Sequence, residues 1–194
     1  ANENQVIIIF DEIQSGFGRT GKLFAYEHYD VEADLVCCGK GISSGLPLSA
    51  VLGRKELIDV DPSLNSTHGG NPICCAATLA SLEVLQDENL ISESARKGLL
   101  LEKELIKIKN KYEDRIEIFG KGLVYAIHVK KSGTKEYDVE IVDRIIEKSM
   151  QKGVLLIRTG TGTIKIGPPL TIFDDALLEG VSVIDESISE CFSW

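Results

Sequence analysis

The sequence has no excess of positive charge and no basic block. Its 30 acidic residues outnumber its 21 basic residues, which gives a formal net charge of −9. Nucleic acids and anionic membrane surfaces bind clusters of lysine and arginine, so we expect neither as a partner. The sequence also lacks an apolar run of the ~20 residues that span a bilayer. Its first four residues lack the basic charge of a secretory leader.

Cysteine is sparse and its spacing is unsuited to cross-linking. The chain has five cysteines, including adjacent pairs at 37–38 and 74–75, which is not the pattern of a secreted disulfide framework. The spacing offers no zinc site either, so no metal is expected. Small buried thiols in a reducing compartment are the favoured interpretation, and we expect a cytoplasmic protein.

The apolar residues that are present follow patterns typical of an α/β protein. Val6–Phe10 and Leu35–Cys38 are continuous apolar runs, which predict strands covered on both faces. Leu48–Leu52 follows through a link too short for a crossover helix, so it is predicted to run antiparallel. We expect a mostly parallel sheet with one antiparallel strand. Because three strands make a thin sheet, we also expect a missing upstream part.

Two helices are predicted to follow this sheet, and then a second unit. Asn71 and Pro72 are typical of a helix start, and apolar residues continue to about Gln86. A longer helix from Ser92 to about Lys111 is predicted to connect to the second unit. The elements expected there are strands at 116–119 and 123–129, a helix at 138–152, strands at 154–157 and 163–166, and a helix at 174–190.

This order of elements predicts two domains. Residues 1–95 are expected to be the C-terminal portion of a large ligand-binding domain. Residues 96–194 are expected to hold the connector helix and a small α/β domain.

Lys40 is the residue with the strongest functional indication. It follows an apolar run and is flanked by Gly39 and Gly41, which let a bulky ligand approach the backbone. A lysine at the end of a buried strand loses hydration of its ammonium group. Its usual use there is nucleophilic attack on a carbonyl, which gives a Schiff base.

Asp11 stands at the C-terminal end of the first apolar run, and Lys40 stands at the C-terminal end of the second. Ligands of open α/β sheets bind outside the carboxyl ends of the strands, so parallel strands would bring both side chains to one rim. An imine-forming lysine and a carboxylate for a pyridinium nitrogen are what a pyridoxal phosphate site requires. Taken singly, Asp11 is better explained as a cap or turn residue and Lys40 as a surface lysine.

Two further segments have some phosphate-binding character. Residues 16–23 nearly match the phosphate loop of nucleotide triphosphatases. However, Leu23 lacks the hydroxyl that magnesium needs, and the acidic strand precedes the loop, so we regard this match as coincidental. Residues 66–72 form a glycine-containing turn into a helix, where free amides suit a phosphate. A turn with a helix cap explains that segment equally well.

Five motifs occur together in the order and approximate spacing of one enzyme family. They are Asp11–Gly21, Ala33–Gly41, Ser66–Pro72, Gly120–Leu123 and Pro168–Thr171. The chain resembles the class III aminotransferases, fold type I pyridoxal phosphate enzymes such as 4-aminobutyrate, ornithine and acetylornithine aminotransferases. The resemblance implies the C-terminal part of the large cofactor-binding domain followed by a small α/β domain.

The resemblance also implies roles for individual residues. Lys40 is similar to the Schiff-base lysine, which also shuttles the proton, and Asp11 is similar to the partner of the pyridine nitrogen. Ile13 is expected against one face of the cofactor ring and Gln14 on the ring hydroxyl. Thr67 resembles a threonine that reaches the cofactor phosphate of the neighbouring subunit, which implies a homodimer with shared active sites.

Two features depart from the family pattern. Many members have a carboxylate-binding arginine before the Pro-Pro-Leu motif, where this chain has Lys165. Lysine keeps the charge but loses the bidentate fork. Arg158 is either a compensating ligand for the carboxylate or a solvated charge at a strand end. The chain also corresponds only to the C-terminal half of the family's chains, without the glycine-rich loop that supplies most phosphate contacts.

The activity implied by the resemblance is transfer of an amino group from an ω-amino acid or related amine to a 2-oxo acid. Racemases and a decarboxylating member share these motifs, so the reaction type stays open, as do the donor and the acceptor. A different alternative is that the chain is a catalytically incompetent half that needs its N-terminal half. That alternative predicts weak cofactor binding by the chain alone.

Overall fold

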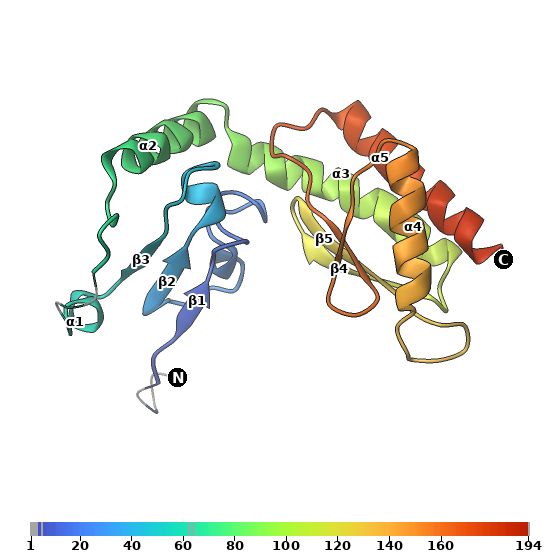
Figure 1. Cartoon of the computed structure of the whole chain (residues 1–194), viewed down its shortest axis with the longest axis horizontal. Coiled ribbons are helices and arrows are strands. Elements are labelled where there is room, and N and C mark those ends of the chain that lie inside the picture. Colours follow the sequence, from blue (N-terminus) through green and yellow to red (C-terminus); the bar gives the residue numbers. More distant parts are fainter. Residues whose placement is uncertain (1–3, 5, 62, 64, 194) are drawn as a thin grey trace. The chain divides into compact units, whose positions relative to one another are not determined.

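The computed structural model describes residues 4, 6–61, 63 and 65–193, and the chain divides into two compact units, Ala1–Glu93 and Ser94–Trp194. The first unit is built on a three-stranded sheet and the second on a four-stranded sheet (Figure 1). Among the described residues, no helix combines the length and the apolar character needed to cross a membrane.

The sheet of the first unit has the mixed topology that the sequence predicts. β1 (Ile9–Asp11) pairs parallel with β2 (Leu35–Cys38), and β2 pairs antiparallel with β3 (Ala50–Gly53). The link from β2 to β3 holds a single 3-10 turn, η3 (Lys40–Ile42), so the chain reverses direction there. The antiparallel third strand is therefore confirmed.

The first strand differs from its prediction in position and in burial. The apolar run predicts a strand over Val6–Phe10 that is covered on both faces, whereas β1 begins at Ile9. Val6 is 57% exposed and Ile9 58% exposed. β-branched composition favours an extended backbone, but burial requires packed neighbours, and β1 is at the edge of its sheet.

The helices of the first unit include two that the sequence did not indicate, η2 (Ala25–His28) and α1 (Lys55–Ile58). A single turn is too short to show helical periodicity. α2 (Pro72–Asp87) begins as predicted, because Asn71 Oδ1 accepts the backbone N–H of Ile73 at 3.0 Å. Asn89, with φ +50°, then separates α2 from α3 (Leu90–Lys111), which begins before the predicted Ser92.

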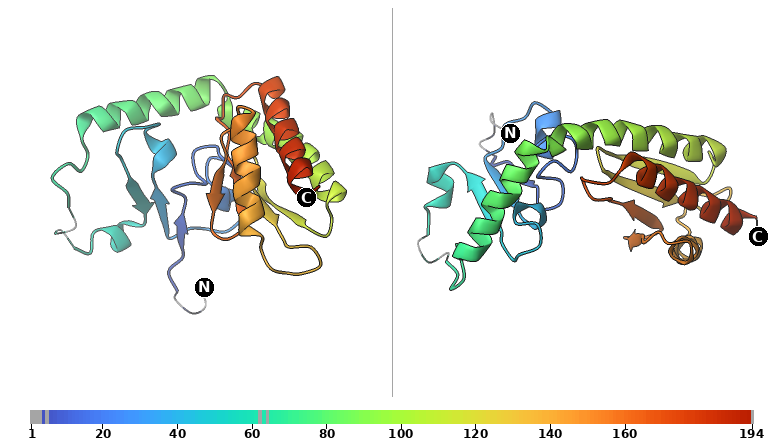
Figure 2. Two further views of the ribbon diagram at one scale, coloured as in Figure 1. Left: turned by 45° about the vertical axis from the view of Figure 1, so that its right-hand side comes forward. Right: turned by 90° about the horizontal axis from the view of Figure 1, so that it is seen from above.

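The second unit is an antiparallel sheet with three packed helices. The strands are β4 (Ile116–Lys121), β5 (Val124–Val129), β6 (Ile157–Thr159) and β7 (Thr163–Ile166), in the order β4-β5-β7-β6. α3, α4 (Val139–Gln151) and α5 (Asp174–Phe192) contribute buried side chains to one core with β4, β5 and β7. Figure 2 shows α4 and α5 side by side.

One strand of this unit lies later in the chain than predicted. The sequence predicts a strand over 154–157, but β6 begins at Ile157. The backbone N–H of Val154 instead donates to the carbonyl of Ser149 at 2.8 Å, so Val154 completes the end of α4. The apolar residues after α4 therefore first complete the end of the helix, and strand pairing begins only at Ile157.

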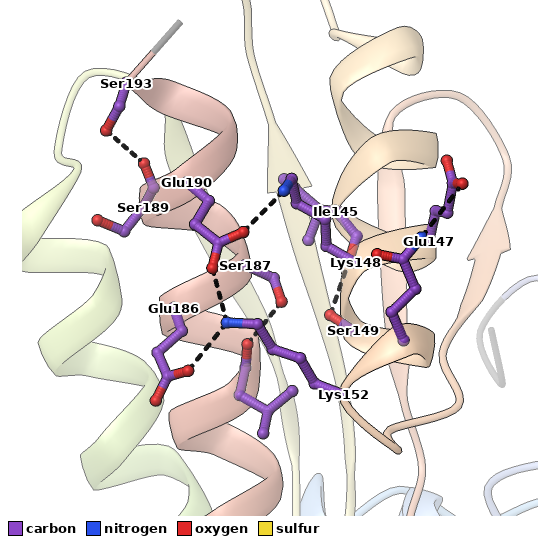
Figure 3. Close-up of polar contacts among 12 residues, drawn as sticks. Ile145, Glu147, Lys148, Ser149, Lys152, Glu186, Ser187, Ser189, Glu190 and Ser193 are labelled. Carbon is purple, nitrogen blue, oxygen red and sulfur yellow. Dashed lines mark hydrogen bonds and ion pairs between the residues drawn. The ribbon is translucent and has the colours of Figure 1, made fainter.

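Ion pairs join α4 to α5 along their exposed edge. Lys152 Nζ lies 2.9 Å from Glu186 and 2.8 Å from Glu190, and Lys148 Nζ lies 2.7 Å from the second oxygen of Glu190 (Figure 3). Hydrogen bonds from Lys148 and Lys152 lower the pKa of Glu190 to about 2. The carboxylate is therefore more favoured in the folded chain than in the unfolded chain.

The depressed pKa of Glu190 predicts an acid-sensitive contribution to stability. The contribution is present above the ordinary pKa of 4.5 and is lost as the pH falls from there towards about 2. Replacing Glu190→Gln should lower the urea midpoint at pH 7 and have progressively less effect below pH 4.5. Glu179→Gln, on the same helix, is the control. A difference between wild type and Glu190→Gln that stays constant with pH would contradict this assignment.

Gly98 brings the backbone of α3 against the turn between β4 and β5. A Cβ at this position would lie 2.4 Å from the Cα of Gly122 and 2.7 Å from its carbonyl carbon. Both partners are backbone atoms, so a side chain at 98 can be accommodated only if the helix or the turn shifts. This contact accounts for a glycine inside a long helix, where glycine is otherwise unfavourable.

We expect Gly98→Ala to destabilise the protein by roughly 1–3 kcal/mol because the added methyl group overpacks a fixed backbone contact. Gly180→Ala in α5 is the matched control, since a Cβ there meets no described atom within 4 Å. That variant should be neutral or stabilising by up to about 1 kcal/mol. Urea unfolding of both variants measures the difference, and equal midpoints would show that the close contact is unimportant.

Candidate active site

Asp11 and Lys40 lie at the same rim of the first sheet. Asp11 pairs with Cys37 in the parallel register of β1 and β2, and β2 ends one residue later. Lys40 then opens the η3 turn. Because the carboxyl ends of parallel strands meet at one edge, Asp11 and Lys40 are placed at the same edge of the sheet. The Asp11 Oδ1 atom accepts the backbone N–H of Ile13 at 3.0 Å, which turns the chain away from the strand.

Lys40 has a strained backbone and an exposed side chain. Its φ angle is +41°, in the left-handed region that residues with a Cβ rarely adopt. The prediction of a lysine dehydrated at the end of a buried strand is wrong for this structure, because Lys40 is exposed. The strand end is buried at Cys38 and Gly39, and the left-handed turn then directs the lysine outward. Strain of this kind is typical of functional positions.

The glycines beside Lys40 allow close packing of the segment that follows Asp11. A Cβ on Gly39 would lie 3.1 Å from Cγ2 of Ile13, so the Ile13 side chain rests directly on the backbone before the lysine. A Cβ on Gly41 would lie 3.2 Å from Cβ of Phe17, which is itself buried. The segment after Asp11 therefore packs on both sides of Lys40, and Ile13 is placed at the rim with it.

Gln14 and Thr67 also belong to the first unit. Gln14 is exposed in the turn that follows Ile13. Thr67 is exposed in the turn before α2, where the N–H of Gly69 donates to the carbonyl of Ser66 at 3.0 Å. α2 in turn contacts η3, the element that carries Lys40. The glycine-rich residues 16–23 form successive turns that lead only to the short η2, whereas a phosphate loop leads into a long helix.

Lys165 and Arg158 belong to the second unit. Lys165 is half-buried on β7, between Ala126 of β5 and Ile157 of β6. Lys165 is among the residues that line a largely apolar pocket of about 450 Å³, whose other walls include Leu101, Leu156, Leu177, Val181 and Ile184. The Nε atom of Arg158 lies 2.7 Å from the Asp143 carboxylate. The structure thus gives Arg158 an acidic partner within its own unit.

One charged residue at the rim, Glu12, was not predicted from the sequence to be part of the site. Glu12 follows Asp11 directly but is only 2% exposed. Burial raises the pKa of the Cys38 thiol, and the neighbouring Cys37 and Glu12 add to the effect. The thiol is therefore kept neutral. The only sequence signal for Glu12 was its position beside Asp11, since a glutamate is by composition expected in solvent.

The sequence model of the family "Aminotransferase class-III" matches residues 1–188. The chain belongs to this family. Family members depend on pyridoxal phosphate, so the rim has to be compared with what this cofactor needs. A primary amine, a carboxylate at the same sheet edge and the apolar Ile13 packed beside them match its aldehyde, its ring nitrogen and its ring face. These residues therefore fit the aldehyde and the ring of the cofactor.

The relatives include enzymes of more than one reaction type. The chain is 37% identical to the 4-aminobutyrate aminotransferase of Mycobacterium leprae and 34% identical to a leucine/methionine racemase of Thermococcus litoralis. Each match covers 97% of this chain and 43% of the relative. The chain thus spans less than half the length of these relatives.

A solved structure has the same fold. The ornithine aminotransferase of Toxoplasma gondii, whose structure shows partial occupancy of PLP at the active site, matches with a TM-score of 0.89 and 33% identity. The match covers 99% of this chain and 45% of the other. The α/β architecture of a fold type I transferase, predicted from the sequence, is therefore confirmed.

The left-handed conformation of Lys40 predicts a difference between two variants that both lack the amine. Lys40→Gly should be more stable than Lys40→Ala by about 1 kcal/mol, because glycine adopts a positive φ without the steric penalty of a Cβ. Urea denaturation of the two proteins measures this difference. If the alanine variant proves equally stable or more stable, the backbone at position 40 is not strained.

Proposed function

We propose that this chain supplies the cofactor-binding lysine and its acidic partner to a pyridoxal 5'-phosphate-dependent aminotransferase. The reaction moves an amino group from an ω-amino acid or related amine to a 2-oxo acid. The observation that carries the proposal is the placement of Asp11 and Lys40 at one rim of a parallel strand pair. Membership of the class III family supports the same reaction class.

Each residue of the rim has a distinct task in this proposal. When bound, pyridoxal phosphate supplies an aldehyde for a primary amine and a ring that accepts the electron pair released at the substrate carbon. Lys40 Nζ is the amine that holds the cofactor, and it then takes and returns the substrate proton as a general base. Asp11 keeps a proton on the ring nitrogen. Ile13 covers one ring face and Gln14 donates a hydrogen bond to the ring hydroxyl.

The substrate carboxylate and the subunit partner are assigned to other residues. Lys165 is our candidate for the carboxylate, because it is a charged residue among those that line a largely apolar pocket. Arg158 is the second candidate, and its pair with Asp143 would have to open first. We propose that Thr67 binds the cofactor phosphate of a second subunit, so that a homodimer shares its active sites.

A racemase is the second candidate function, because one relative bears that name. Both reactions begin with removal of the proton from the carbon that carries the amine, and Lys40 serves that step in each. They differ in where the proton returns. A racemase returns it to the same carbon, whereas an aminotransferase delivers it to the cofactor side of the bond.

The proposal is tested by titrating the purified chain with pyridoxal phosphate, followed by borohydride reduction and peptide mass mapping. We expect a new visible absorption band and a stable mass addition on Lys40, because a primary amine at a preorganised rim reacts ahead of solvated lysines. Asp11→Asn should shift the band, since the ring nitrogen loses its partner.

Two lysine variants make the labelling specific. Lys40→Ala should abolish the band, whereas Lys22→Ala should leave it unchanged, because Lys22 is also exposed and beside a glycine but lies away from the strand ends. Labelling spread evenly over many lysines, unaffected by Lys40→Ala, would contradict a working site in this chain. It would favour the alternative of a half that requires further residues.

A further inference from the structure

Glu12 is a buried carboxylate for which the proposed reaction has no use. It is 2% exposed, and both of its oxygens are engaged. Oε2 accepts the hydroxyl of Ser15 at 2.5 Å, and Oε1 accepts the backbone N–H of Tyr26 at 2.8 Å. A carboxylate is costly to bury unless such donors replace its water, so the site is built to hold this group in one place.

The backbone of Glu12 is fixed as firmly as its side chain. Its N–H donates to the carbonyl of Cys37 at 2.9 Å, which continues the pairing of β1 with β2 beyond Asp11. Its carbonyl accepts the N–H of Gly16 at 3.0 Å, and a Cβ on Gly16 would lie 2.8 Å from that oxygen. The turn that carries Ile13 and Gln14 is therefore closed at both of its ends through Glu12.

The bond to Tyr26 closes the longer loop that follows. Tyr26 lies in η2. Its ring stacks on Phe10 of β1 at a centroid distance of 5.2 Å and on Phe24 at 5.9 Å. The Glu12 carboxylate thus ties the far end of the loop to the strand end from which the loop departs. Closing such a loop costs chain entropy, which the buried hydrogen bonds and the stacked rings offset.

We infer that Glu12 is a positioning residue for the cofactor site, an inference that rests on the proposed function. Its carboxylate holds the turn that presses Ile13 onto the backbone of Gly39, directly before Lys40. Glu12 touches neither the cofactor nor the substrate. It acts through the placement of Ile13 and Gln14, and without it the turn is free to lift from the rim.

The hydrogen-bonding pattern predicts which variants keep this role. In Glu12→Gln the amide oxygen can still accept from Tyr26, and the amide nitrogen can donate to Ser15, whose hydroxyl is able to reverse. Glu12→Ala loses both bonds, and Ser15→Ala loses one. Glu27→Ala is the matched control, since this exposed glutamate of the same loop also accepts a backbone N–H, that of Phe24 at 2.7 Å.

The experiment measures amide hydrogen exchange and cofactor labelling on the full chain. Glu12→Ala should speed exchange of the Tyr26 and Gly16 amides by tenfold or more and raise the pyridoxal phosphate concentration for half-labelling of Lys40 by roughly tenfold. Glu12→Gln should restore both to within about twofold of wild type, since both hydrogen bonds can be retained. Ser15→Ala should fall between them, and Glu27→Ala should change neither measurement at these positions.

Each outcome separates the two proposals. If wild type is labelled at Lys40 and Glu12→Ala is labelled equally well, the positioning role is overturned. If wild type itself is not labelled, the proposed function fails for this chain, and unchanged exchange in Glu12→Ala then overturns the role of Glu12 as well. Exchange in peptides of β2 and β3, which belong to the same unit as Glu12, reports whether a variant is folded. Should Glu12→Ala not fold, the comparison of Glu12→Gln with Ser15→Ala decides.

Discussion

The candidate site depends on the parallel pairing of β1 with β2. Asp11 and Lys40 are far apart in the sequence, and only a parallel register brings the ends of their strands to one edge. An antiparallel pair would place them at opposite ends of the sheet. This pairing is short. The hydrogen bond from the Glu12 N–H to the Cys37 carbonyl is therefore important, because it extends the register beyond Asp11.

Packing on both sides of Lys40 explains how its left-handed backbone conformation is maintained. Ile13 lies against Gly39 and Phe17 lies against Gly41, so the backbone is enclosed where the strain is stored. Lys40 opens η3 in this left-handed conformation, and its side chain is exposed at the rim.

The sequence predicts best those elements whose signals are local. Asn71 and Pro72 mark the start of α2, Asp138 caps α4 by accepting the N–H of Ile141, and β7 occupies its predicted residues. Burial is predicted poorly, because it depends on what packs against an element. β1 is exposed for this reason, and Glu12 is buried against every expectation for its residue type. Asp11 and Lys40 were predicted to share a rim because strand ends follow from local patterns, but the buried Glu12 beside Asp11 was not predicted.

The second unit is where the proposed substrates would be distinguished. Relatives named as an aminotransferase and as a racemase can share the chemistry of the rim, since both reactions begin by removing the same proton. A lysine ammonium is a point charge, so Lys165 constrains the orientation of a carboxylate less than the fork of an arginine does. If Lys165 binds the substrate carboxylate as proposed, apolar walls such as Leu156, Leu177 and Val181 would limit the length and shape of the carbon chain. On this proposal, selectivity rests on shape more than on charge.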